Sequence, residues 1–197
     1  MIGMHTSTVA LESAPSPRVF WGRPWIPSFT AATLGVVLVV LERAIGALGY
    51  QWAVVTAVAV LAMWLAWIDE RTFTLPNRWV GALAAFGCVQ VVGSAFAPAS
   101  TGPALGAVGA AVIVTVIYVG LGFAGAVGFG DVKFAAALTL AVGSVAGLIA
   151  VYLAQLAFAV SAVRIMARKA RGADPRHPHG TSLAVAGISV LLFAATI

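Results

Sequence analysis

The sequence predicts an all-α protein, a polytopic membrane helix bundle with about six to seven transmembrane helices. The composition is the first reason: 61% of the residues are hydrophobic, 9% are charged and the mean hydropathy is +1.03, whereas soluble domains carry about 25% charged residues. The second reason is that the apolar residues form runs of the length that a lipid bilayer requires. These runs do not alternate polar with apolar residues, which excludes barrel strands and leaves helices.

The apolar runs divide the chain into a polar N-terminal segment, 1–28, and a membrane domain, 29–197. They predict spans at about 29–48, 50–68, 79–97, 104–123 and 181–197. As a single helix the run 134–167 would measure roughly 51 Å, longer than the bilayer core is thick. It is therefore one long projecting helix, or a short helix, a break and a full span. Gly143 and Gly147 mark the break that we favour, although the same pair can form a close helix-packing face.

The positions of the charged residues predict the topology and argue against a nucleic-acid partner. The net charge is +5, but the basic residues fall singly in short loops, as topology signals do. With a cytoplasmic N-terminus and a break near 143–147, Arg43 lies outside. The other ten basic residues then lie inside: Arg18, Arg23, Arg71, Arg78, Lys133, Arg164, Arg168, Lys169, Arg171 and Arg176. This predicts a multi-pass protein of the cytoplasmic membrane.

Two carboxylates at the ends of predicted spans form the candidate catalytic site. Asp69 ends the second span, and Asp131 follows Gly128-Phe129-Gly130 at the start of the fifth. An ionisable group at the rim of a span is a candidate functional residue, and two neighbouring carboxylates titrate as a coupled pair that can share one proton. Such a pair can hydrolyse a peptide bond without a metal or cofactor: the ionised group takes a proton from water, and the protonated group donates to the carbonyl oxygen.

Ordinary interfacial roles are the alternative for the same residues. Asp69 could pair with Arg71 or Arg78, and Asp131 could pair with Lys133 or cap the following helix. Arg71 and Lys133 could instead hold a carboxylate in its charged form, or bind phosphates of membrane lipid. Two aspartates on one side, one of them behind Gly-x-Gly, favour the catalytic interpretation.

Several further residues are weaker candidates for the site than Asp69 and Asp131. Glu70 competes with Asp69 as the partner of Asp131, but on a continuous helix it points about 100° away from Asp69. His177 and His179 flank Pro178 in a polar loop and are expected to be solvated, because a metal site needs more ligands. Cys88 is expected to be a small core residue.

Three stretches resemble the type IV prepilin peptidases and the related preflagellin peptidases. They are Asp69 with Leu75-Pro76-Asn77, then Gly128-Phe129-Gly130-Asp131-Val132-Lys133, and finally Pro178-His179-Gly180, where Thr181 or Ser182 replaces the family's second proline. The resemblance covers roughly 50–197 and leaves 29–48 as an extra N-terminal helix. It implies a membrane aspartic endopeptidase with Asp69 and Asp131 as the catalytic pair. The implied substrate is a pilin-like precursor, cleaved at the cytoplasmic face.

The chain departs from the larger members of that family, which carry a cysteine-rich domain between their first spans and also methylate the new N-terminus. Here the first two spans follow each other directly and Cys88 is the single cysteine, so a short form without methyltransferase activity is expected. Two other functions stay open. One is a proton-coupled transporter, although no internal repeat is seen; the other is a catalytically inactive pilus-assembly protein.

Overall fold

The computed structural model describes residues 26–96, 101–172 and 178–196, and these residues are almost entirely helical. Most of the polar segment 1–28, together with Arg18, Arg23, Arg176 and His177, lies outside the described residues. In chain order the elements are α1 (Ile26–Thr72), α2 (Asn77–Ala95), α3 (Thr101–Phe123), α4 (Phe129–Ala146), the 3₁₀ helix η2 (Gly147–Val151), α5 (Tyr152–Ala170) and α6 (Gly180–Thr196). The described part of the chain contains no strand, so the all-α prediction is confirmed.

Four helical segments are long and apolar enough to cross a membrane. They are Ile45–Thr72, Asn77–Ala95, Pro103–Phe123 and Phe129–Ala170, and shorter apolar helices occur at Pro27–Glu42 and Gly180–Thr196. The first predicted span is therefore shorter than expected, because α1 kinks at Gly46, with φ of 73°, before its second part begins. Several apolar helices of this length agree with the predicted multi-pass membrane protein.

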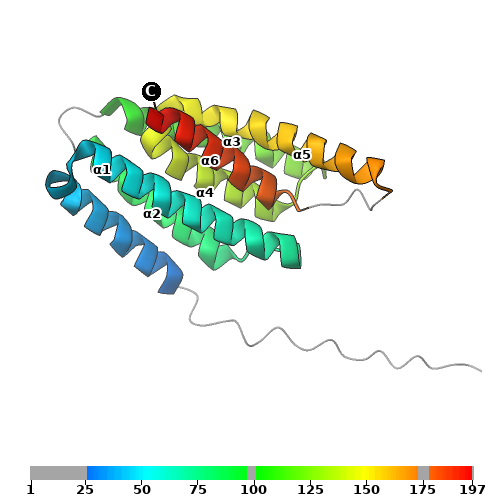
Figure 1. Ribbon diagram of the computed structural model, residues 1–197, viewed down its shortest axis with the longest axis horizontal. Helices are drawn as coiled ribbons and strands as arrows, with labels where there is room; N and C mark the ends of the chain where they lie inside the picture. Colours follow the sequence, from blue (N-terminus) through cyan, green and yellow to red (C-terminus); the bar gives the residue numbers. More distant parts are fainter. Residues whose placement is uncertain (1–25, 97–100, 173–177, 197) are drawn as a thin grey trace, which may run out of the picture.

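The long apolar segment is broken at Gly147. This residue has φ of 57°, a left-handed conformation that glycine adopts without steric cost. Phe158 of α5 lines the same pocket as Asp131 of α4, yet a continuous helix would hold them about 40 Å apart. The chain therefore turns back after α4, as Figure 1 shows. Gly143 has the packing role instead, because a Cβ atom there would lie 2.7 Å from the Cα of Ala107 on α3.

Successive helices run in alternating directions, with α4 near the centre of the bundle (Figure 1). Helix α4 packs against α2, α3 and α6, and its Phe134 and Leu138 are fully buried. Large apolar side chains such as Leu105 and Val116 face outward, as expected of surfaces that contact lipid. Cys88 also faces outward, so its predicted core position is wrong. The turn of α2 directs its neighbours Phe86 and Gly87 into the core instead.

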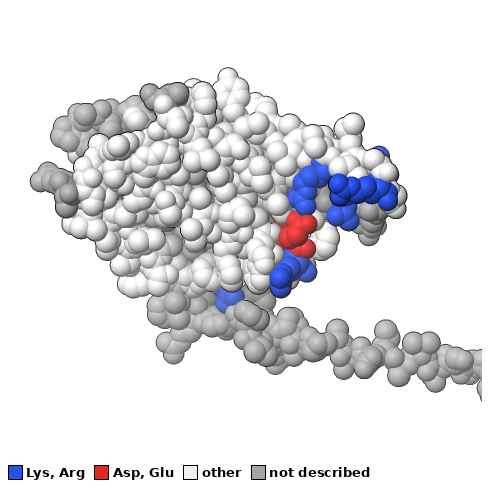
Figure 2. Space-filling view, viewed as in Figure 1, with Lys and Arg blue, Asp and Glu red and all other residues white. Residues whose placement is uncertain are grey.

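The described charged side chains other than Glu42 gather at one end of the molecule. Figure 2 shows lysine, arginine and acidic side chains there, while most of the rest of that face is uncharged. Arg168 and Lys169 belong to the last turn of α5, Arg71 belongs to the last turn of α1, and Asp131 belongs to the first turn of α4. The charges therefore mark the end of the bundle at which α1 and α5 finish and α4 begins.

Candidate active site

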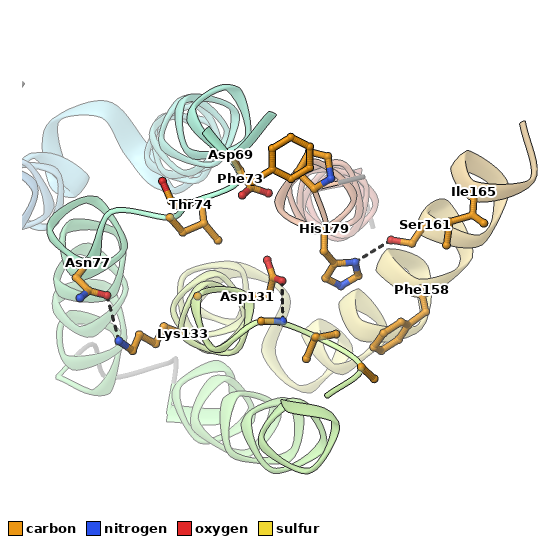
Figure 3. Close-up of a pocket in the computed structure, with 16 residues that line it drawn as sticks. Asp69, Phe73, Thr74, Asn77, Asp131, Lys133, Phe158, Ser161, Ile165 and His179 are labelled. Atoms are coloured by element: carbon orange, nitrogen blue, oxygen red, sulfur yellow. Dashed lines mark hydrogen bonds between the residues drawn. The ribbon is translucent and has the colours of Figure 1, made fainter. Parts of the chain in front are cut away.

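A pocket of about 640 Å³ opens at the charged end of the bundle, a volume typical of ligand sites. Residues from all three motif stretches line it: Asp69 and Asn77 from the first, Gly128, Gly130, Asp131 and Lys133 from the second, and Pro178 and His179 from the third. They meet because α1 ends, and α2, α4 and α6 begin, at the same end of an up-and-down bundle (Figures 1 and 3).

Asp69 lies one turn before the end of α1 and is 4% exposed. Its Oδ2 accepts a hydrogen bond of 2.8 Å from the backbone N–H of Gly180, the first residue of α6. A Cβ atom at position 180 would lie only 2.6 Å from the same oxygen. The contact thus requires glycine, which explains how the late Pro-His-Gly stretch belongs to the site.

Asp131 is the third residue of α4 and is half-buried. Its Oδ2 accepts the N–H of Gly128, the N-cap residue, at 3.2 Å. Asp131 is therefore not the N-cap residue itself. It caps α4 from the third helical position, where a side chain can accept the N–H of the N-cap residue. The same carboxyl group also points toward Asp69 across the pocket (Figure 3), which Asp69 lines as well.

The neighbouring cations make contacts other than the expected ion pairs. The Nζ of Lys133 donates to the Oδ1 of Asn77 at 3.1 Å, which ties the second motif to the first. The guanidinium carbon of Arg71 lies 4.3 Å from the ring centre of Trp67. These contacts orient Lys133 and Arg71 independently of the two aspartates.

Glu70 points away from the pocket. The helix continues through Thr72, so Glu70 is rotated from Asp69 as a continuous helix requires. Its carboxylate accepts from the Nη2 of Arg164 at 3.0 Å and from the hydroxyl of Thr181 at 2.6 Å. Glu70 therefore joins α1 to α5 and α6 rather than facing Asp131.

His179 is not the solvated loop residue that the sequence suggested. It is half-buried and lines the pocket. Its Nε2 lies 2.9 Å from the hydroxyl of Tyr118, and its Nδ1 lies 2.8 Å from the Oγ of Ser161. Sequence reasoning missed Tyr118 and Ser161. The available signal was a tyrosine inside an apolar run, because a buried phenol usually has a hydrogen-bond partner.

A model of a known protein family covers much of the chain. The family model described as the type IV leader peptidase family matches residues 56–163, more than half of the chain. The chain belongs to the type IV leader peptidase family. The matched region contains both aspartates, Leu75-Pro76-Asn77 and the Gly-x-Gly-Asp stretch. It begins after the kink in α1 and ends within α5, so the first part of α1 and all of α6 lie outside it. Searches of curated proteins and of solved structures give no match.

Proposed function

We propose that this member of the type IV leader peptidase family is a membrane aspartic endopeptidase that removes the leader of pilin-like precursors, with Asp69 and Asp131 as its catalytic pair. One observation carries the proposal. The two carboxyl groups, which are 62 positions apart in the chain (131 − 69), point toward each other in one pocket (Figure 3). Each also accepts a backbone N–H, from Gly180 and Gly128 respectively, so each is held in place.

The proposed reaction uses one water molecule and one proton shared by the pair. The ionised aspartate takes a proton from water as the water oxygen attacks the peptide carbonyl carbon, and the protonated aspartate donates to the carbonyl oxygen. When the tetrahedral intermediate collapses, the C–N bond breaks. A proton then passes to the departing amine, which becomes the new N-terminus. Two carboxylates that face each other in one pocket do not both ionise easily, which favours the singly protonated state that the reaction needs.

The family suggests the class of substrate, and the position of the pocket suggests the side of the membrane on which cleavage occurs. Membership of the leader peptidase family implies a precursor protein as substrate. The pocket opens at the end that carries Arg164, Arg168 and Lys169, and basic ends of membrane helices usually face the cytoplasm. We therefore place cleavage at the cytoplasmic face, just before the hydrophobic helix of the precursor. We place no methyltransferase activity in this chain, since α1 passes through Gly46 with no inserted domain.

The proposal is tested by cleavage of a pilin precursor with purified protein in detergent. Asp69→Asn and Asp131→Asn each keep the side-chain shape but remove the acid, so each should lower the cleavage rate by at least about 100-fold. Glu70→Gln is the matched control, because this substitution removes an adjacent carboxylate that faces Arg164 instead of the pocket. It should retain most of the activity, and sequencing of the product should locate the cut.

Two results would contradict the proposal. Activity above about a tenth of wild type in Asp131→Asn would exclude a catalytic role, given the size of general acid–base effects. A folded wild-type protein that cleaves none of several precursors would favour an inactive pilus-assembly protein or a proton-coupled transporter.

A further inference from the structure

Three aromatic rings, from α3, from α5 and from the residue before α6, pack together beside the pocket. The ring of His179 is stacked on Phe158 of α5, with centroids 5.4 Å apart, and lies 5.8 Å from the ring of Tyr118 of α3. Tyr118 and Phe158 are themselves stacked at 5.4 Å. Tyr118 is fully buried, so the imidazole is seated against the interior of the bundle and has a defined orientation.

Both ring nitrogens of His179 are occupied by hydroxyl groups. Nε2 contacts the Tyr118 hydroxyl and Nδ1 contacts the Ser161 hydroxyl, at 2.9 Å and 2.8 Å. A general base needs a nitrogen directed at the proton that it removes, and here neither nitrogen is available for water. The imidazole instead bridges α3 and α5 and fixes the place where α6 begins.

The next residue in the chain connects this bridge to the candidate catalytic pair. Gly180 follows His179 directly, and its N–H donates to Asp69 at 2.8 Å. The peptide unit that carries this N–H is formed by the carbonyl of His179 and the nitrogen of Gly180. A shift of the His179 backbone therefore moves the donor that holds Asp69, which is itself buried.

We propose that His179 is a positioning residue of this site: by bridging Tyr118 and Ser161 it sets the Gly180 amide against Asp69. This inference rests on the proposed function for its effect on catalysis, although the geometry that it describes exists without substrate. A displaced catalytic carboxylate lowers the rate of the chemical step more than substrate binding. Loss of the bridge should therefore lower kcat and leave KM nearly unchanged.

The principal variant is His179→Phe, which keeps a ring that can stack on Phe158 but removes both hydrogen bonds. We expect kcat to fall on the order of 10–100-fold, with KM within about twofold. His179→Gln supplies a donor and an acceptor and should recover part of that loss. Tyr118→Phe and Ser161→Ala each remove one hydrogen bond and should each cause a smaller fall in kcat.

Matched controls and a double variant separate positioning from general stability. Tyr152→Phe and Ser144→Ala make the same chemical changes in residues that do not line the pocket, and should leave kcat unchanged. Because Tyr118 would act through His179, the double variant Tyr118→Phe/His179→Phe should be no slower than His179→Phe alone. A purely additive result would show that the two residues act separately and would overturn the bridge.

A second measurement does not depend on activity. In protein labelled with ¹⁵N-glycine, the Gly180 amide, assigned by its loss in Gly180→Ala, should show the downfield proton shift of a bond to a carboxylate. Asp69→Asn and His179→Phe should both move that signal. If His179→Phe leaves the signal and kcat as in wild type, the inference is wrong, while the proposed function stands. If wild type cleaves no precursor, the proposed function fails, and the Gly180 signal alone decides whether His179 sets this contact.

Discussion

Backbone amides hold both carboxylates of the site, and glycines supply them. Asp69 accepts from Gly180 and Asp131 accepts from Gly128, while the neighbouring cations Lys133 and Arg71 contact Asn77 and Trp67. An amide donor carries no net charge, so it can fix a carboxylate without tying it into an ion pair. Each carboxylate of the site therefore has a backbone amide as one of its partners.

Gly180→Ala tests how closely Asp69 is held. The added Cβ would lie 2.6 Å from Oδ2 and 3.1 Å from the Cβ of Asp69, so the carboxyl group or the start of α6 must move. We expect the cleavage rate to fall on the order of 100-fold, with the protein still inserted and monodisperse in detergent. Gly120→Ala, where no atom lies within 4 Å of the added Cβ, is the control. A Gly180→Ala variant with more than half of the wild-type rate would show that this close contact is unimportant.

At the residue scale the sequence could predict the acids but not their supports. Asp69 and Asp131 stand out because acidic residues are rare in apolar surroundings, and the structure brings them into one pocket. Tyr118 and Ser161 reach His179 from helices that are distant in sequence. Nothing in the sequence around Tyr118 or Ser161 indicates His179 as the partner. The polar loop around His179 predicts a solvated side chain instead.

At the scale of the helices, the end of α1 acts as a junction. Consecutive residues of this helix, Asp69 and Glu70, bind α6 through Gly180 and Thr181, and Glu70 also binds Arg164 of α5. The arrangement exists because α1 stays helical through Thr72, which turns the two side chains to different sides. Loss of the Glu70–Arg164 pair should cost at most about 1 kcal/mol, since both side chains are partly exposed.

The pair Gly143 and Gly147 shows why the sequence alone does not locate the break in the long apolar run 134–167. A Gly-x-x-x-Gly pattern is compatible with a break and with close packing, and the structure assigns one role to each glycine: Gly147 ends α4 and Gly143 contacts α3. The chain reversal after α4 depends on where α3 lies, because a Cβ atom at Gly106 of α3 would lie 2.5 Å from the backbone of Leu148. That is tertiary information, which periodicity does not contain.

Gly143→Leu should separate α3 from α4 and lower stability. Its Cβ would lie 2.7 Å from the Cα of Ala107, a backbone atom that cannot move aside alone. Overpacking of this kind usually costs about 1–3 kcal/mol, so the apparent Tm in detergent should fall measurably, and activity should fall with it because α4 carries Asp131. Gly120→Leu, at an open position of α3, should change neither. An unchanged Tm in Gly143→Leu would mean that the close α3–α4 contact is absent in the protein.

At the scale of the whole molecule, alternating helix directions explain why one end carries the site. Helices α1, α3 and α5 end, and α2, α4 and α6 begin, at the same side of the bundle (Figure 1). The described charged side chains other than Glu42 gather there (Figure 2). The charge distribution in the sequence predicts this grouping without any motif. The basic residues lie in alternate connections between apolar runs, and those connections face the same side of the membrane. The length of the first helix does not follow in the same way, because nothing in the charge pattern marks the kink at Gly46.

The proposed orientation makes a prediction about which side of the membrane each end faces. In a Cys88→Ser background, a cysteine introduced at Arg171, at the charged end, should react with a membrane-impermeant maleimide only in inside-out vesicles. A cysteine at Phe96, which is 83% exposed at the opposite end of α2, should react only in intact cells. Neither position lines the pocket, so both variants should still cleave precursor, and their activity verifies that the labelled protein is native. The reversed labelling pattern would place the pocket outside the cell, where a leader on the cytoplasmic side of the membrane cannot reach it.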